Sequence, residues 1–319
     1  MATLKDIAQR AGVTATTVSR VINNRGYISE GTRKKVYAAM EEMHYQPNEL
    51  ARAFSKQYTN TIGLIVPHIS HPFFTKVISN IESSAAEKGF KLLLCNSKEQ
   101  PEKEQDYLDM CISNRVAGIV LCSKYVQTRE FRKMNIPVVN LERGGDDDTI
   151  SVQCDNYQGG KLAAEHLIEC GCKNLLHFGG VAGKDMPADR RADGFSDVCK
   201  KAGIPYRILV SDRLQYGSMH YEDFIRRALQ EFPDVDGIFA SSDLIASQVI
   251  QVGAQMDKHV PEDIQLVGFD DVMISTVTTP QITTIHQPVE EMAELCVEYI
   301  TKSLKNEPVP QKIVLPVRL

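Results

Sequence analysis

The chain has 319 residues, of which 43% are hydrophobic and 24% charged, as expected for a globular protein of two or three compact units. Its apolar runs have strand length, which excludes a transmembrane helix, and its charged N-terminus is unlike a signal peptide, so we expect a cytoplasmic protein. Most of the eight cysteines stand alone in apolar segments, and the close pair Cys170 and Cys172 has no second pair at zinc-site spacing. We therefore expect no disulfide framework, no metal site and no membrane partner.

The net charge of −5 is distributed unevenly along the chain. Residues 1–58 contain nine Lys and Arg against five acids, which gives +4, and the remaining residues carry −9. A basic segment attached to an acidic body favours binding of a polyanion such as DNA through the basic segment alone. Ordinary fluctuation of charge along the chain is the alternative, and charge by itself does not exclude it.

Two short helices joined by a glycine turn are predicted at the N-terminus. Apolar residues within Leu4–Ala11 recur at the spacing of one helix face, and Gly12 is suited to end that helix. Thr14 is a suitable cap for a second helix, in which Val18, Val21 and Ile22 would face inward. The side chains left outside are small or polar: Ala15, Thr16, Ser19, Arg20 and Asn23. This pattern predicts a helix-turn-helix, and a small structural bundle is the alternative.

A third helix is predicted from Thr32 to Met43, with Val36 and Met40 on its inner face. Its first turn contains the basic residues 33–35, which oppose the helix dipole. A phosphate partner would compensate for this arrangement, and simple solvation is the alternative.

From residue 60 onward, short apolar runs alternate with helical patterns, which predicts parallel sheets with helices on both faces. The expected strands are Ile62–Val66, Lys91–Cys95, Gly118–Cys122, Pro137–Leu141, Asn174–Phe178, Gly237–Ala240 and Gln265–Phe269. The expected helices are Phe73–Lys88, Lys103–Asn114, Tyr157–Glu169, Arg191–Lys201 and Leu244–Met256. Two successive sheets fit a two-lobed α/β binding protein, with its ligand in the cleft at the carboxyl ends of the strands.

Motifs for catalysis are missing from the sequence. The stretch from Gly179 to Asp185 superficially resembles a phosphate-binding loop, but Gly179 and Gly183 are one residue too close, and Asp185 replaces the magnesium-binding Ser or Thr. The sequence has no dinucleotide fingerprint, nucleophile elbow or zinc-binding helix motif. We therefore expect a protein that is not an enzyme and needs no cofactor.

The segments that follow the predicted strands contain groups suited to bind a ligand. They include His71, Phe73, Phe74, Glu142, Arg143, Arg190, Arg191, Ser242, Asp243, Asp270 and Asp271. Arginines and acids that meet at strand ends could bind hydroxyl groups through bidentate hydrogen bonds. For each residue taken singly, a core aromatic or a solvated surface charge is the alternative.

The segments Leu4–Ala8, Ala11–Thr14 and Thr17–Asn23 together resemble the headpiece of the lactose/galactose repressor (LacI/GalR) family. The resemblance continues through Tyr45–Asn48 and Ala51-Arg52, and covers the whole chain. It implies an all-α helix-turn-helix headpiece with a two-lobed α/β effector domain that resembles periplasmic binding proteins. The implied boundaries are 1–47 for the headpiece, 48–59 for a hinge helix and linker, and 60–319 for the effector domain. Lobe one would contain about 60–156 and 288–312, and lobe two about 157–285 and 313–319.

The resemblance also implies DNA contacts. Ala15, Thr16 and Arg20 would read base edges in the major groove. Phosphate binding and register would depend on Thr3, Thr14, Thr17, Ser19, Asn23, Tyr27, Ser29 and Thr32. The hinge would contact DNA through Asn48, Ala51 and Phe54. Phe54 matches the wedge residue, usually leucine in the family, that enters and kinks the minor groove.

The effector site implied by the resemblance centres on two residues. Arg191, in an Arg-x-x-Gly-Phe pattern, matches the effector arginine of the family, and Asp270 matches its effector aspartate. The other expected contacts are His71, Phe73, Phe74, Glu142, Arg143, Tyr216, Ser242 and Gln287. Glu142 is one methylene longer than the usual aspartate, which would suit a smaller or tilted effector.

These observations predict a transcriptional repressor whose affinity for operator DNA is controlled by a sugar or sugar phosphate. Sugar-utilisation repressors, the sucrose-operon type foremost, are the favoured subtype. A homodimer is expected because two headpieces suit a pseudopalindromic operator and no heptad-patterned tail is present. A global regulator of the same fold that depends on a co-repressor or a protein partner is the alternative. A solute-binding protein of a transporter is disfavoured, because it would need an export signal and no headpiece.

Overall fold

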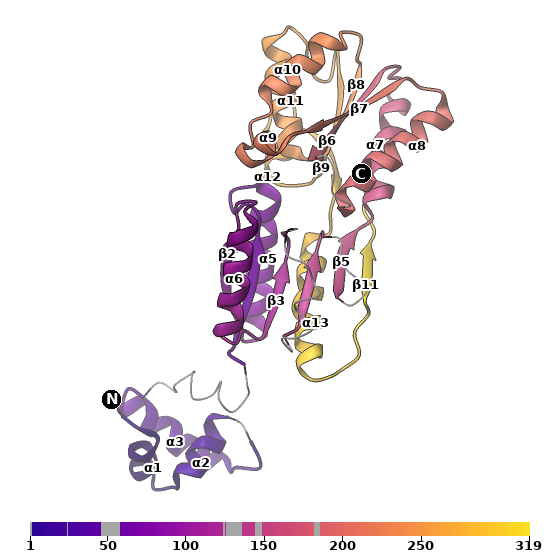
Figure 1. Ribbon diagram of the computed structural model, residues 1–319. Helices are drawn as coiled ribbons and strands as arrows, with labels where there is room; N and C mark the ends of the chain where they lie inside the picture. The colour runs from indigo at the N-terminus through magenta and orange to yellow at the C-terminus, as the bar shows by residue number, and fades with distance from the viewer. Residues whose placement is uncertain are drawn as a thin grey trace. The chain divides into compact units, whose positions relative to one another are not determined.

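The computed structural model describes residues 2–23, 25–45, 58–123, 125, 136–143, 149–181 and 186–319. The chain divides into two compact units, Met1–Asn60 and Thr61–Leu319 (Figure 1). Within the described ranges, no helix combines the length and the apolar character needed to cross a membrane.

The described part of the smaller unit contains the helices α1 (Leu4–Ala11), α2 (Ala15–Ile22) and α3 (Glu30–Glu42). α1 ends at Gly12, whose φ of 67° lies in the left-handed region that favours glycine. The Thr14 side chain caps α2 by accepting a hydrogen bond from the Thr17 amide. The Ser29 side chain caps α3 in the same way, so this helix begins two residues before the expected Thr32. The core of this unit contains Ile7, Ala8, Val18, Val21, Val36 and Ala39. The predicted helix-turn-helix is confirmed.

The first lobe of the larger unit is built on a six-stranded parallel sheet of order β11-β5-β4-β3-β1-β2. Its strands are β1 (Thr61–Val66), β2 (Lys91–Asn96), β3 (Gly118–Leu121), β4 (Val138–Leu141), β5 (Ile150–Cys154) and β11 (Lys312–Leu315). Its helices are α5 (Pro72–Glu87), α6 (Pro101–Ser113) and α13 (Val289–Leu304). α5 and α13 pack against each other, and α6 contacts β1.

The second lobe is built on a five-stranded parallel sheet of order β10-β9-β8-β6-β7. Its strands are β6 (Leu175–Val181), β7 (Tyr206–Ser211), β8 (Gly237–Ala240), β9 (Gln265–Asp270) and β10 (Thr283–His286). Its helices are α7 (Asn156–Glu169), α8 (Arg190–Ala202), α9 (Arg213–Ser218), α10 (Glu222–Glu231), α11 (Asp243–Gln255) and α12 (Met273–Val277), with a 3₁₀ turn at Pro187–Asp189. Two parallel-sheet lobes confirm the predicted fold class.

The assignment of the terminal strand to lobe two is wrong. β11 pairs in parallel with β5 of the first lobe, where Ile313 is opposite Val152 and Leu315 is opposite Cys154. The pairing buries Leu315 in the core of that lobe and satisfies the backbone of an edge that β5 would otherwise expose. Only past this strand does the chain return toward the second lobe, where Arg318 forms an antiparallel bridge with His286.

Glycines allow α7 and α8 to approach closely. A Cβ on Gly160 of α7 would overlap the carbonyl oxygen of Arg191, and a Cβ on Gly194 of α8 would overlap the carbonyl oxygen of Tyr157. Both neighbours are backbone atoms, which cannot move aside as a flexible side chain can. The close packing therefore fixes the backbone of Arg191, at the start of α8, against α7.

Candidate functional site

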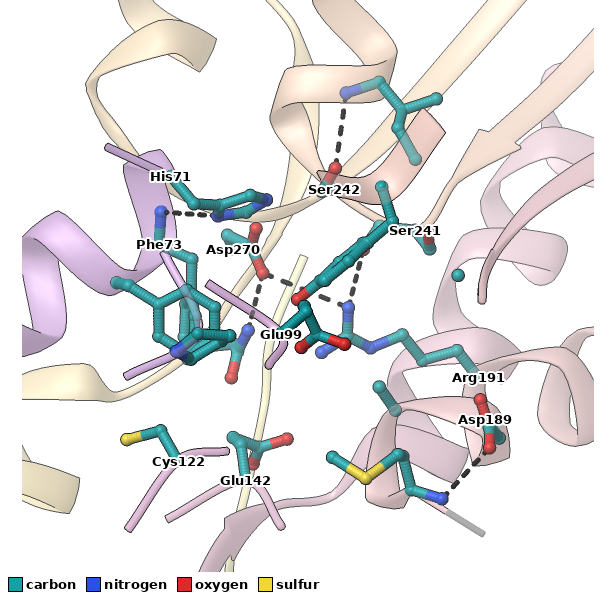
Figure 2. A pocket seen from close by; sticks show the side chains of 18 of the residues that line it. His71, Phe73, Glu99, Cys122, Glu142, Asp189, Arg191, Ser241, Ser242 and Asp270 are labelled. Atoms are coloured by element: carbon teal, nitrogen blue, oxygen red, sulfur yellow. Dashed lines mark hydrogen bonds and ion pairs between the residues drawn. The ribbon is translucent and has the colours of Figure 1, made fainter. Parts of the chain in front are cut away.

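A cavity of about 140 Å³ lies in the larger unit, where the carboxyl ends of strands from both lobes meet (Figure 2). Nine residues that the sequence predicts for the effector site line it: His71, Phe73, Phe74, Glu142, Arg191, Tyr216, Ser242, Asp270 and Gln287. They come from loops and helix starts that are far apart in sequence. The parallel topology brings them together because all strands of a lobe end at the same edge.

Arg191 is the central cation of this cavity, although its side chain is only 7% exposed. Its Nε donates a hydrogen bond to Asn156 Oδ1 at 2.7 Å, and its Nη1 donates to the Ser241 carbonyl at 2.6 Å. The guanidinium lies over the ring of Phe269, 3.5 Å from its centroid. Figure 2 shows the guanidinium turned toward Asp270, whose Oδ1 lies 4.0 Å from Nη1. These contacts hold the arginine in one orientation.

Asp270 ends β9 with a φ of 112°, a backbone conformation that residues other than glycine rarely adopt. Burial raises the pKa of its carboxyl group well above the ordinary value, and the nearby Arg191 opposes this change. Gln287 Nε2 donates to Asp270 Oδ1 at 2.7 Å. The Oε1 atom of Gln287 is buried and has no hydrogen-bond partner among the described residues. A ligand hydroxyl could donate to this oxygen.

His71 supplies a hydrogen-bond donor to the same cavity. Its Nδ1 accepts a hydrogen bond from the Phe73 amide at 3.3 Å and so caps α5. Burial lowers the pKa of His71 to about 4, so the ring is neutral at pH 7. Since Nδ1 is the acceptor, the ring proton is on Nε2. The rings of Phe74 and Tyr216 lie 5.6 and 6.5 Å from the His71 ring and add an apolar wall.

Glu142 and Arg143 differ in their positions although they are neighbours. Glu142 lines the cavity, where its carboxylate accepts hydrogen bonds from the Cys154 amide and Asn156 Nδ2. Arg143 is not among the residues that line the cavity; its Nη1 donates to Asn140 Oδ1 at 3.0 Å. The two side chains therefore serve different partners, and Glu142 is the one that faces the cavity.

Several lining residues were not predicted from the sequence. Glu99 follows β2, so its position after a strand is the signal in the sequence that marks it. Ser241, Tyr221 and Asp189 also line the cavity, and no local pattern distinguishes them from ordinary loop or helix residues. Within the described ranges, no three His, Cys, Asp or Glu side chains cluster as metal ligands.

The predicted DNA-reading side chains share one face of α2. Ala15, Thr16 and Arg20 are exposed, whereas Val18 and Val21 on the other face are buried. Exposure on one face leaves the three side chains accessible to a groove of DNA.

The predicted phosphate-binding residues of the smaller unit have structural contacts as well. Thr3, Thr14 and Ser29 cap α1, α2 and α3, respectively. Thr17 and Thr32 hydrogen-bond through their hydroxyls to the second and third of these caps. Asn23 Nδ2 donates to the Ser19 carbonyl, and Tyr27 is 99% exposed. The predicted hinge residues Asn48, Ala51 and Phe54 lie outside the described residues.

Comparisons with known proteins agree with this architecture. Residues 3–48 match the family described as bacterial regulatory proteins, lacI family, and residues 164–319 match the periplasmic binding protein-like domain. The chain is 33% identical to the ribose operon repressor of Halalkalibacterium halodurans, over 99% of this chain and 96% of that protein. It is 35% identical to the sucrose operon repressor of Pediococcus pentosaceus, over 99% of this chain and 97% of that protein.

A similar solved structure is that of a periplasmic binding protein/LacI transcriptional regulator from Alkaliphilus metalliredigens, complexed with D-xylulofuranose. The two chains share 32% sequence identity with a TM-score of 0.73. The similarity covers 82% of this chain and 97% of the other.

Asp243, at the first turn of α11, is a fully buried acid beside the site. Its Oδ2 accepts a hydrogen bond from the Val272 amide at 2.9 Å, and its Oδ1 accepts from Thr284 Oγ1 at 2.5 Å. Burial raises the pKa of Asp243 from 3.8 to about 6, and the hydrogen bonds oppose this rise. The carboxylate thus connects α11, β10 and the segment after β9, although its charged form is unfavourable there.

We expect Asp243→Asn to increase stability at pH 7.5. The folded protein binds the Asp243 proton more tightly than the unfolded chain does, so wild-type stability falls as the pH rises from about 4 to about 6. The loss is at most about 3 kcal/mol, at about 1.4 kcal/mol for each pKa unit. Asparagine keeps an acceptor for the Val272 amide and can donate to Thr284 Oγ1, so the local hydrogen bonds remain. Because asparagine does not titrate, the variant should lose this pH dependence. Urea unfolding from pH 4 to 7.5 measures it, and an unchanged slope would contradict the burial argument.

Proposed function

This chain belongs to the lacI family of bacterial regulatory proteins, and we propose that it is a DNA-binding transcriptional repressor whose operator affinity is set by a sugar bound in the cavity. The observation that carries the proposal is the joining of an exposed α2 reading face to a unit with a buried Arg191, Asp270 and Gln287 cluster. Such a chain is not an enzyme. The relatives named for ribose and sucrose operons support the control of carbohydrate genes.

The cavity favours an uncharged sugar over a sugar phosphate. Four carboxylates, those of Glu99, Glu142, Asp189 and Asp270, line its described part, where Arg191 is the one Lys or Arg. Two of the three guanidinium nitrogens of this arginine already donate hydrogen bonds to protein acceptors. A phosphate dianion would meet an excess of like charge, which costs affinity. Hydroxyl groups, by contrast, can both donate to these acids and accept from Arg191 and His71.

The size of the cavity agrees with a small ligand. Its volume of about 140 Å³ is below the roughly 300 Å³ at which sites for drug-sized ligands begin. A monosaccharide therefore fits this cavity better than a larger oligosaccharide does.

We also propose that the sugar acts as an inducer. The chain crosses between the lobes beside the site, once before Asn156 of α7 and again at Gln287, after β10. A ligand that favours one arrangement of the lobes would weaken operator binding if the operator favours another, and the effect is reciprocal. A co-repressor would have the opposite sign, so the direction of the effect on operator affinity distinguishes the two.

A homodimer is proposed from exposed apolar side chains. Leu214 of α9, Met273 and Val277 of α12, and Leu94 of the edge strand β2 are between 42% and 82% exposed. Figure 1 shows these elements along the same side of the larger unit. Exposed apolar side chains on one side of a protein are typical of an interface, and a second copy of the chain would supply the second reading helix that a palindrome requires.

For the dimer, we expect Met273→Asp to shift the protein toward monomer, because a charge would be buried in the proposed interface. Sedimentation equilibrium measures the dissociation constant. Val210→Asp is the matched control, since Val210 is 47% exposed on β7, at an edge of the other sheet. Equal dissociation constants for the two variants would contradict this interface.

For operator recognition, we expect Arg20→Ala to weaken specific binding by about 1–3 kcal/mol, because Arg20 would lose a base contact in the major groove. A palindrome selected from a random DNA pool serves as the operator in competition gel shifts. Arg10→Ala is the matched control, since Arg10 pairs with Glu42 at 2.7 Å, outside the α2 face. If both variants lost the same affinity, α2 would not be the reading helix.

For the effector site, we expect one or more of D-ribose, sucrose and D-xylulose to lower operator affinity of the unaltered protein, and Arg191→Ala to remove the response. Operator affinity without sugar should stay within about twofold, because the two hydrogen bonds that Arg191 donates join it to Asn156 and Ser241 of the larger unit. Isothermal calorimetry and gel shifts measure both quantities, with ribose 5-phosphate as the charged comparison. Loss of operator binding in the variant, or tighter binding of the phosphate, would contradict the proposal.

A further inference from the structure

A buried chain of hydrogen bonds connects the first lobe to Arg191. It begins at the Cys154 amide, which donates to Glu142 Oε1 at 2.5 Å. Glu142 Oε2 accepts from Asn156 Nδ2 at 3.0 Å, and Asn156 Oδ1 accepts from Arg191 Nε at 2.7 Å. Glu142, Asn156 and Arg191 are 8%, 3% and 6% exposed, so water does not replace these bonds easily.

We propose that Glu142 and Asn156 are positioning residues for the effector site, which act by fixing the orientation of Arg191. Nε and Nη1 are engaged by protein acceptors, and within the described residues Nη2 makes no hydrogen bond. These hydrogen bonds thereby leave Nη2 of Arg191 available in the cavity as the donor for a sugar hydroxyl. This inference rests on the proposed function, since it assigns a role to residues of the same site.

The number of hydrogen-bond donors and acceptors in this network requires that one of its two side chains is a carboxylate. Two N–H donors, of Cys154 and Arg191, stand at its ends, and the two side chains between them must accept from both. A carboxylate at position 142 and an amide at position 156 satisfy every contact. The Glu142 carboxylate only accepts, whereas the Asn156 amide accepts from Arg191 and donates both to Glu142 and, at 3.2 Å, to the Cys154 carbonyl. With two amides, one donor must face another donor, whichever way the amides turn. With two carboxylates, two charged acceptors face each other.

Glu142 is held for this role more than for direct ligand binding. Both of its oxygens accept hydrogen bonds from the protein, although the residue lines the cavity. Its backbone has a φ of 49°, and its amide donates to the Val152 carbonyl at 3.0 Å. This strained conformation at the end of β4 turns the side chain toward Asn156 and not toward Asn140, which Arg143 contacts.

The test compares four full-length proteins: the unaltered chain, Glu142→Gln, Asn156→Asp and the double variant Glu142→Gln/Asn156→Asp. The double variant exchanges the positions of the carboxylate and the amide, so that the two side chains would again satisfy both end donors. It still lacks the 3.2 Å hydrogen bond from Asn156 Nδ2 to the Cys154 carbonyl, because aspartate cannot donate. Asn140→Asp is the matched control, because Asn140 is likewise buried on β4 but bonds Arg143 and Thr149.

The first readout needs no ligand. The Arg191 Nε–H resonance in a ¹⁵N correlation spectrum, assigned by its loss in Arg191→Lys, should exchange slowly with solvent in the unaltered chain, the control and the double variant. In each single variant at pH 8, the Arg191 Nε–H proton should exchange fast with solvent, or its resonance should disappear. A purely structural role for Glu142 and Asn156 would lower thermal stability in all three variants without recovery of the resonance in the double variant.

The second readout is calorimetric affinity for the tightest binder among D-ribose, sucrose and D-xylulose. We expect a loss of about tenfold to a hundredfold in each single variant and recovery of most of this loss in the double variant, which lacks only the hydrogen bond to the Cys154 carbonyl. Recovery of slow Nε–H exchange and of sugar affinity in the double variant supports the inference. Single variants that keep slow exchange and full affinity, or a double variant as impaired as the single variants, overturn it. If the unaltered protein binds none of the sugars, the proposed function fails. The Arg191 Nε–H resonance alone then decides whether Glu142 and Asn156 orient Arg191.

Discussion

The burial of one guanidinium group is the constraint on which the larger unit depends. A charge removed from water is costly unless hydrogen bonds and opposite charge replace its hydration. Arg191 obtains them from Asn156, the Ser241 carbonyl, the face of Phe269 and, at 4.0 Å, Asp270. These partners come from separate segments of the chain, so the arginine has this environment only when both crossover regions and the second sheet are in place.

The surrounding backbone is adapted to this constraint. Glu99, Glu142 and Asp270 line the cavity with positive φ values, which residues with a Cβ seldom adopt. Gly160 allows the first turn of α8 to lie directly on α7, which places Arg191 at the correct depth. Carboxylates with strained backbones around one buried cation are the arrangement expected at a ligand-binding site, where function and not only folding determines the residues.

The proposed switch follows from where the chain crosses between the lobes. Asn156 begins the first helix after one crossing, and Gln287 follows the last strand before the next. Both belong to the hydrogen-bonded set that includes Arg191 and Asp270. A sugar bound to that set would therefore act on the connections between the lobes, and a change of lobe arrangement would act on the site. Such coupling needs no continuous path of packed residues to the DNA-binding unit, only two lobe arrangements with different affinities.

Local patterns made much of the fold predictable. The caps at Thr14 and Gly12 and the apolar spacing of α1 and α2 act within a few residues, so a single sequence displays them. Buried strands such as β1 and β8 form short apolar runs, and the predicted limits agree closely with the observed ones. The edge strand β7 was missed because its side chains are partly exposed, which weakens the apolar signal.

By itself, then, the sequence determined the helix-turn-helix, the two parallel-sheet lobes and the residue types at the strand ends, because these depend on periodicity and turn chemistry. Only the tertiary structure decided which strand-end side chains meet. Asn156 and Ser241 lie 35 and 50 residues from Arg191, and no local pattern marks them as its partners. The choice of Glu142 over Arg143 for the cavity, and the pairing of β11 with the first sheet, were likewise decided by packing at long range. Side-chain direction and strand partners depend on the whole fold, so local physics alone could not specify them.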